Sequence, residues 1–245
     1  MNWNKINNRG FTLVELVIII IIIGIIATVA TRQMSETIED ARYEQTKQEL
    51  NQLALAITGN PEIRTNGIRS NFGYVGDIGA LPANLTVLYT NTSGYTTWNG
   101  PYIDGGTSGT EHTTDAWGAN YTYNDTLIRS TGSGTFIDKI FAISSAALLN
   151  NNINGIVMDA ARTMPGSVYM DSIQLTLTYP DGVGGLKDTI VNPNKSGNFS
   201  FINIPIGNHT LKAIYIPDTD TVIYNLCILP QKTSYIEIMF PVDLW

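Results

Sequence analysis

A run of twenty residues near the N-terminus, from Phe11 to Ala30, constrains this chain more than any other feature. It contains three polar residues, of which only Glu15 carries a charge. At about 1.5 Å per residue, a helix of this length spans roughly 30 Å, the thickness of a membrane's hydrocarbon core. The basic residues Lys5 and Arg9 precede the run, and no A-x-A cleavage pattern follows it. The sequence therefore predicts a retained membrane anchor with a cytoplasmic N-terminus and all later residues on the outer side.

The carboxylate of Glu15 lies near the start of this span, where an unpaired charge costs at least about 2.5 kcal/mol. The residues around it, Gly10-Phe11-Thr12-Leu13-Val14-Glu15-Leu16, resemble the prepilin-peptidase motif of type IV pilins and pseudopilins. The resemblance implies cleavage between Gly10 and Phe11, N-methylation of Phe11, and pairing of Glu15 with the Phe11 ammonium of a neighbouring subunit. The implied partners are a prepilin peptidase, homologous pilin or pseudopilin subunits and the inner membrane. The alternative is a plain single-pass anchor in which Glu15 occurs by chance.

The helix is expected to continue beyond the membrane span. Apolar residues recur from Met34 to Ile57 at spacings of three, four and their sums, and charged residues fill the other faces. No proline interrupts residues 11–60, and Gly59-Asn60-Pro61 is a typical helix end. The sequence therefore predicts one helix over residues 11–60, which the resemblance identifies with the spine helix of pilins.

The middle of the chain, from Asn71 to Asp159, is rich in Gly, Thr, Asn and Tyr, and we expect loops, short strands and turns there. It contains Trp98 and the pair Trp117-Gly118, in an order that resembles the major pseudopilin of type II secretion. A tryptophan followed by glycine at a turn lets the indole fold under the backbone and fill the space between a small sheet and the long helix. The alternative is ordinary turn chemistry.

The major-pseudopilin resemblance also implies a calcium site in an acidic loop after this motif. The matching stretch here, residues 146–155, follows an expected strand at Phe141–Ser145 and contains asparagines instead of acids. Neutral ligands bind a hard dication weakly. We therefore expect no metal or other cofactor, with calcium as a weak option. Its candidate ligands are acids that otherwise serve as turn and cap residues, namely Asp115, Asp125, Asp138 and Asp159.

The C-terminal part is strand-like after Met164-Pro165-Gly166. Apolar residues alternate with polar ones in several short segments separated by turn residues, and six or so strands predict a small β-sandwich over residues 165–245. The segment Gly197–Leu211 resembles the signature of carboxypeptidase-regulatory-like, prealbumin-type domains. His209 stands where that pattern usually has an aromatic residue. The resemblance implies a fold and no activity, and we expect His209 to be a packed residue.

Composition narrows the function further. The chain has 14 Lys and Arg against 21 Asp and Glu, a formal net charge of −7, so it repels phosphate backbones and no nucleic acid partner is expected. The single cysteine, Cys227, excludes an intrachain disulfide. With two histidines and no motif for a nucleophile, a zinc site or a phosphate loop, we expect no catalytic residues and no enzyme.

Together these features predict an α+β protein, in which a long spine helix packs on a small loop-rich antiparallel sheet and a small all-β sandwich follows. The expected divisions are a leader at 1–10, the helix at 11–60, a pseudopilin-like domain at 61–164 and the sandwich at 165–245. The expected function is a structural subunit of a type IV pilus-like or type II secretion filament. Before assembly it is anchored in the inner membrane, with its C-terminal part periplasmic or extracellular. The alternative is a membrane-anchored adhesin or carbohydrate-binding protein that uses the C-terminal β-domain.

Overall fold

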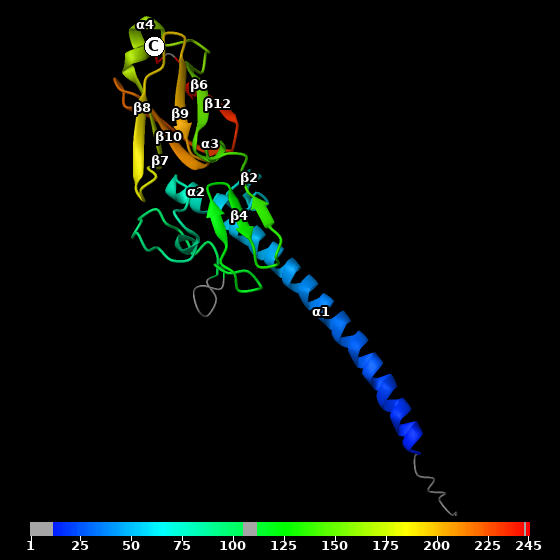
Figure 1. Cartoon of the computed structure of the whole chain (residues 1–245). Coiled ribbons are helices and arrows are strands. Elements are labelled where there is room, and N and C mark those ends of the chain that lie inside the picture. The colour runs from blue at the N-terminus through cyan, green and yellow to red at the C-terminus, as the bar shows by residue number, and fades with distance from the viewer. Residues whose placement is uncertain (1–11, 105–111, 243) are drawn as a thin grey trace, which may run out of the picture. The chain divides into compact units, whose positions relative to one another are not determined.

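The computed structural model describes residues 12–104, 112–242, 244 and 245 (Figure 1). The chain is α+β, as the sequence predicts, with one long helix followed by short helices and β-sheets. It forms two compact units, Met1–Gln45 and Thr46–Trp245. Helix α1 (Leu13–Thr58) contributes to both.

Helix α1 has 46 residues, close to the predicted extent. In the first unit every described residue, from Thr12 to Gln45, is exposed. In the second unit the helix has a buried stripe with the three- and four-residue spacing of one helical face, made of Thr46, Leu50, Leu53, Ala54, Ala56 and Ile57. The helix ends where Gly59 adopts a φ of 81°, and a side chain there would collide with the backbone of Asn71 and Phe72.

Arg69 closes the C-terminal end of α1. Its guanidinium donates to the carbonyl oxygens of Thr58 (2.6 Å) and Gly59 (3.2 Å) through Nη2, and to that of Asn71 (2.8 Å) through Nε. The last carbonyls of a helix lack intrahelical partners, and a basic side chain satisfies them. Arg69 belongs to β2 (Ile68–Arg69), which pairs with β1 (Arg64–Thr65).

The buried stripe of α1 contributes to a first hydrophobic core. Most of its other members come from the short helices α2 (Gly73–Ile78), η1 (Leu85–Leu88) and α3 (Ser145–Leu149), and from an antiparallel sheet of β3 (Thr122–Asn124), β4 (Leu127–Ser130) and β5 (Ile137–Ile140). The rest are the loop residues Phe72, Ile103, Tyr121 and Ile206. The sheet order is β3-β4-β5. This is the small loop-rich antiparallel sheet that we expected beside the spine helix.

A second core lies between two sheets. One has the order β11-β10-β7-β8 and the other β12-β6-β9. The strands are β6 (Asn151–Asp159), β7 (Ile173–Pro180), β8 (Leu186–Val191), β9 (Asn198–Ile204), β10 (Gly207–Tyr215), β11 (Asp220–Ile228) and β12 (Thr233–Phe240). Two further helical turns, α4 (Gly166–Tyr169) and η2 (Met170–Ser172), precede β7. Both sheets contribute to one hydrophobic cluster, so the predicted sandwich is present.

Strand β6 precedes the residue at which we expected the sandwich to begin. It is the central strand of its sheet, parallel to β12 and antiparallel to β9. The asparagine-containing stretch 146–155, expected as a loop, forms most of α3 and the first half of β6. The strand expected at Phe141–Ser145 is absent from these described residues, because β5 ends at Ile140 and α3 begins at Ser145.

Candidate functional site

The first turn of α1 has a reciprocal hydrogen-bond arrangement. Glu15 N donates to Thr12 Oγ1 (3.2 Å), and Glu15 Oε2 accepts from Thr12 N (3.4 Å). This is a capping box, in which two residues three apart satisfy the free donors at a helix start. The spacing Thr-x-x-Glu is visible in the sequence and would have predicted it. The two residues expected at the processing site, Gly10 and Phe11, lie outside the described residues.

The helix after Glu15 has an apolar surface with no cover within its own unit. Leu13 is 82% exposed, and the isoleucines from Ile18 to Ile26 are between 41% and 62% exposed. This helix is long and apolar enough to cross a membrane. A surface of this kind requires lipid or other protein to cover it.

Trp98 lies half-buried against the first core. Its indole Nε1 donates to Val87 O (3.0 Å), and its ring meets Tyr102 edge to face at 5.6 Å between centroids. A side chain at Gly100 would collide with the indole. Glycine at this position therefore lets the backbone cross the ring closely.

The second tryptophan follows Asp115, whose side chain organises the turn around it. Asp115 Oδ1 accepts from the backbone N of Trp117 (3.0 Å) and Ala119 (2.9 Å). Its Oδ2 accepts from Ser130 Oγ (2.6 Å) and Gly132 N (3.0 Å). Burial alone raises the pKa of this carboxyl, but the four hydrogen bonds together outweigh burial and lower the pKa.

This turn is attached directly to α1. Ala116 N donates to Thr46 Oγ1 (3.2 Å), and Tyr121 OH donates to Glu49 Oε2 (2.7 Å). Trp117 packs against the first core, and Gly118 takes the left-handed φ of 85° that the turn requires. The motif thus joins the small sheet to the helix within the second unit.

The four acids considered as calcium ligands have separate structural roles. Asp138 makes a two-point ion pair with Arg129 (2.6 and 2.8 Å), Asp159 Oδ1 accepts from Thr163 N (2.7 Å), and Asp125 lies in the β3–β4 turn with a φ of 26°. Asp115 accepts four hydrogen bonds, two from its own turn and two from Ser130 and Gly132. Over the described parts of the chain, no three His, Cys, Asp or Glu side chains gather into a group that could hold a metal ion.

His209 is buried in the fold, and Cys227 is partly buried against the first core. His209 is 2% exposed, its ring lies 5.9 Å from that of Tyr179, and burial lowers its pKa. Burial also raises the pKa of the Cys227 thiol, whose Sγ lies 3.8 Å from Arg69 O. An imidazole kept neutral and a thiol kept protonated are packing groups here, as we expected of His209.

Residues 5–31 match the family model described as the prokaryotic N-terminal methylation motif. The match includes Gly10, Phe11 and Glu15, and it marks the N-terminus as that of a type IV pilin-like or pseudopilin-like precursor. The motif lies at the start of a helix that is long and apolar enough for a membrane anchor. No curated protein matches the chain.

Several solved structures show weak likeness to parts of the chain. One is the dioxygenase domain of a dioxygenase carbohydrate-binding protein fusion from Streptomyces sp. SirexAA-E, at 12% identity over 42% of this chain and 86% of that one, with a TM-score of 0.30. A streptococcal ancillary pilin is 12% identical over 42% of this chain and 36% of that one, with a TM-score of 0.26. The major pilin subunit of Bacillus cereus is 10% identical over 51% of this chain and 41% of that one, with a TM-score of 0.24. At these TM-scores the likenesses carry no argument about function.

Proposed function

We propose that the chain is a structural subunit of a filament of the type IV pilus or type II secretion kind. A prepilin peptidase processes it between Gly10 and Phe11, and it waits in the inner membrane before assembly with homologous subunits. The observation that carries this proposal is the methylation motif at residues 5–31 on a helix whose described residues are all exposed as far as Gln45. Lipid covers that surface before assembly, and neighbouring helices cover it in a filament.

Glu15 is the residue that we assign to assembly. Among the described residues, its carboxylate has the local partners of the capping box and no basic partner, and it lies where a charge is costly. In a filament the ammonium of a neighbour's Phe11 supplies an opposite charge. The favourable free energy of this charge pair exists only between subunits. It therefore favours the assembled state and one register of neighbouring helices.

The processing step has a direct test. Coexpression with an active prepilin peptidase should give a mature chain that begins at Phe11, with one added methyl group, as intact-mass analysis would show. Gly10→Leu should block cleavage but leave membrane insertion unchanged, since the apolar run is untouched. A chain that keeps residues 1–10 in the presence of active peptidase would overturn this assignment.

Variants can separate the proposed role of Glu15 in assembly from its role in the capping box. Glu15→Ala removes both the charge and the cap, Glu15→Gln keeps a capping side chain without the charge, and Thr12→Ala removes the cap but keeps the charge. If charge pairing drives assembly, incorporation into filaments should be poor for Glu15→Ala, intermediate for Glu15→Gln and near wild type for Thr12→Ala. The measurement is the fraction of processed protein in sheared filaments relative to the membrane pool.

The capping box alone predicts a different order. In that case Glu15→Gln incorporates like the wild type, and Thr12→Ala fails like Glu15→Ala. That result would remove the pairing mechanism without affecting the filament assignment, which the processing test and the presence of wild-type chain in filaments decide.

A further inference from the structure

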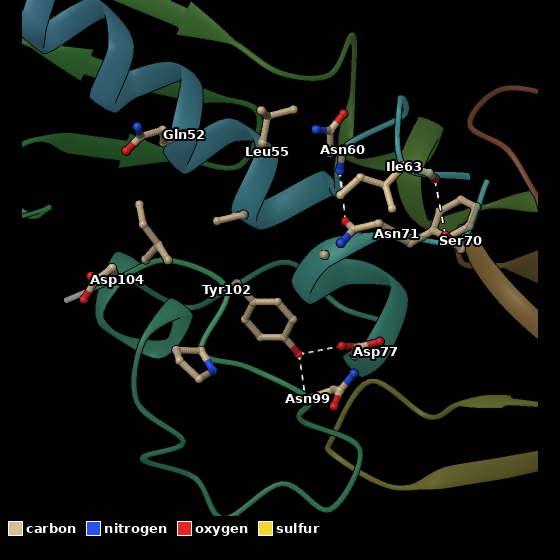
Figure 2. Close-up of a pocket in the computed structure, with 15 residues that line it drawn as sticks. Gln52, Leu55, Asn60, Ile63, Ser70, Asn71, Asp77, Asn99, Tyr102 and Asp104 are labelled. Atoms are coloured by element: carbon tan, nitrogen blue, oxygen red, sulfur yellow. Dashed lines mark hydrogen bonds between the residues drawn. The ribbon is translucent and has the colours of Figure 1, made fainter. Parts of the chain in front are cut away.

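A cavity of about 490 Å³ lies beside the C-terminal end of α1, within the second unit. Its walls are the last turns of α1, the segment that leads into α2, and the loop of residues 99–104 (Figure 2). This volume falls in the range of small-molecule sites in proteins. Neither filament assembly nor the sandwich core accounts for it.

A carboxylate and a phenol meet at this cavity. Tyr102 OH donates to Asp77 Oδ2 (2.8 Å) and accepts from Asn99 N (3.1 Å), as Figure 2 shows. Asp77 comes from α2, and burial raises its pKa although the bond from Tyr102 partly opposes this. Within the described residues, the structure gives Asp77 no ion-pair partner. A half-buried carboxylate with one oxygen uncommitted is a costly group in an empty cavity.

The ring of Tyr102 is held in a defined position. Trp98 and Tyr74 contact it edge to face, with centroid distances of 5.6 and 5.7 Å. These contacts and the bond to Asp77 fix the ring before any ligand arrives. A preformed site avoids the entropic cost of ordering its side chains on binding.

The other lining groups define the chemistry of a ligand. Four side-chain amides line the cavity, from Gln52, Asn60, Asn71 and Asn99. Asn71 Oδ1 accepts from Asn60 N (2.9 Å), which leaves the Asn71 amide nitrogen as a donor. The cavity therefore offers both donors and acceptors. Its charged lining residues are the acids Asp77 and Asp104, with no lysine or arginine among the residues that line it.

This combination disfavours two ligand classes. An anion would meet the carboxylate of Asp77, which has no ion-pair partner among the described residues. A cation would pair with Asp77 but would gain nothing from the free amide nitrogen of Asn71, whose oxygen already accepts from Asn60 N. A hydroxyl group both donates and accepts, so a neutral polyhydroxylated ligand satisfies carboxylate and amides together.

We propose that this cavity binds a neutral mono- or disaccharide, with one hydroxyl on Asp77 and others on the amides of Asn71 and Asn99. The site lies in the pilin-like part of the second unit, not in the β-sandwich. It is independent of whether the chain assembles into filaments. A subunit with such a site would attach to neutral glycans while it also serves as a structural element.

Binding is testable on the full chain in a zwitterionic detergent, because detergents with sugar head groups would compete. The probes are a panel of neutral mono- and disaccharides, with lysine methyl ester as the cationic probe and glucose 6-phosphate as the anionic one. Saturation-transfer NMR detects binding, and tryptophan fluorescence follows it through Trp98. At least one neutral sugar should bind saturably, and more tightly than either charged probe.

Two variants locate the binding. Asp77→Asn keeps an oxygen for the Tyr102 hydroxyl and should weaken sugar binding about tenfold or more, and Asn99→Ala should also weaken it. Asp218→Asn, in the exposed β10–β11 turn, is the matched control and should bind like the wild type. Thermal melts confirm that each variant is folded. The proposal is overturned if no neutral sugar binds, if lysine methyl ester binds most tightly, or if both cavity variants bind like the control.

Discussion

At the residue scale, Asp115 is the side chain that joins the turn around Trp117 to the end of β4. Its carboxylate accepts from two backbone donors of its own turn, from the hydroxyl of Ser130 at the end of β4 and from the backbone N of Gly132. The side chain is 5% exposed, so loss of its charge leaves buried donors without a full partner. Its effect on stability is therefore large for a turn residue and depends on its ionisation.

We expect Asp115→Asn to lower the free energy of unfolding by about 1–3 kcal/mol at neutral pH. The folded-state pKa of Asp115 lies below its ordinary value, so its contribution is fully present above the unfolded pKa of about 3.9 and is lost as pH falls through the folded-state pKa. The difference between wild type and variant should therefore be constant above about pH 5 and shrink below about pH 4. Denaturant melts across this range measure it.

Asp138→Asn is the control for this prediction. The bond to Arg129 also lowers the pKa of Asp138, but this ion pair lies on the surface, where water screens it. The variant should show little change at any pH. An equal effect at the two positions would mean that charge, and not the buried hydrogen bonds of Asp115, determines the loss.

At the element scale, β6 is a central strand that the sequence analysis did not predict. Its inward residues Ile153 and Val157 are fully buried, whereas Asn152 and Asn154 point outward and are exposed. This is a period-two pattern, but asparagine is uncommon in strands and common in turns. These residues form a strand because they pair with β12, which is distant in the sequence.

This assignment of β6 predicts which fragments fold. Residues 145–245 contain all seven strands of the sandwich and should give a cooperative melt and a β-type circular dichroism spectrum. Residues 166–245, which omit only Pro165 from the sandwich expected at 165–245, lack β6 and leave β9 and β12 without their shared neighbour. They should melt without cooperativity. A stable 166–245 fragment would show that β6 is dispensable for the sandwich.

The features predictable from sequence are those with local periodicity. The extent of α1, its end at Gly59, and strands β7 and β9 to β12 follow from residues a few positions apart. The capping box of Thr12 and Glu15 was equally local. The bond between Asp77 and Tyr102 joins residues 25 apart, and Ser130 reaches Asp115 across 15 residues. No spacing rule connects such pairs, because the fold of the intervening loop brings them together.

At the scale of the whole molecule, the two units differ in what they require from their surroundings. Thr46–Trp245 has its own cores, and its buried helical stripe begins at Thr46. The described part of Met1–Gln45 is a helix with its apolar residues exposed. The described apolar surface of the first unit therefore requires lipid or protein to cover it, whereas the second unit has hydrophobic cores of its own.

Removal of residues 1–45 should convert the protein from membrane-bound to soluble without loss of fold. The full chain should remain in the pellet after alkaline carbonate extraction, whereas the shortened chain should stay in the supernatant. Its thermal melt in buffer should remain cooperative. Aggregation of the shortened chain would show that the second unit depends on the first for its stability.

The parallel pairing of β6 with β12 has a mechanical consequence. These are the first and last strands of the sandwich, and they lie side by side along residues 152–159 and 233–240. A pull on the two ends of the sandwich drags the neighbouring strands in opposite directions along their length. The tension then loads the evenly spaced row of backbone hydrogen bonds in shear, all together, instead of opening them one after another. A sandwich with this strand order therefore resists extension along the whole length of the β6–β12 pair.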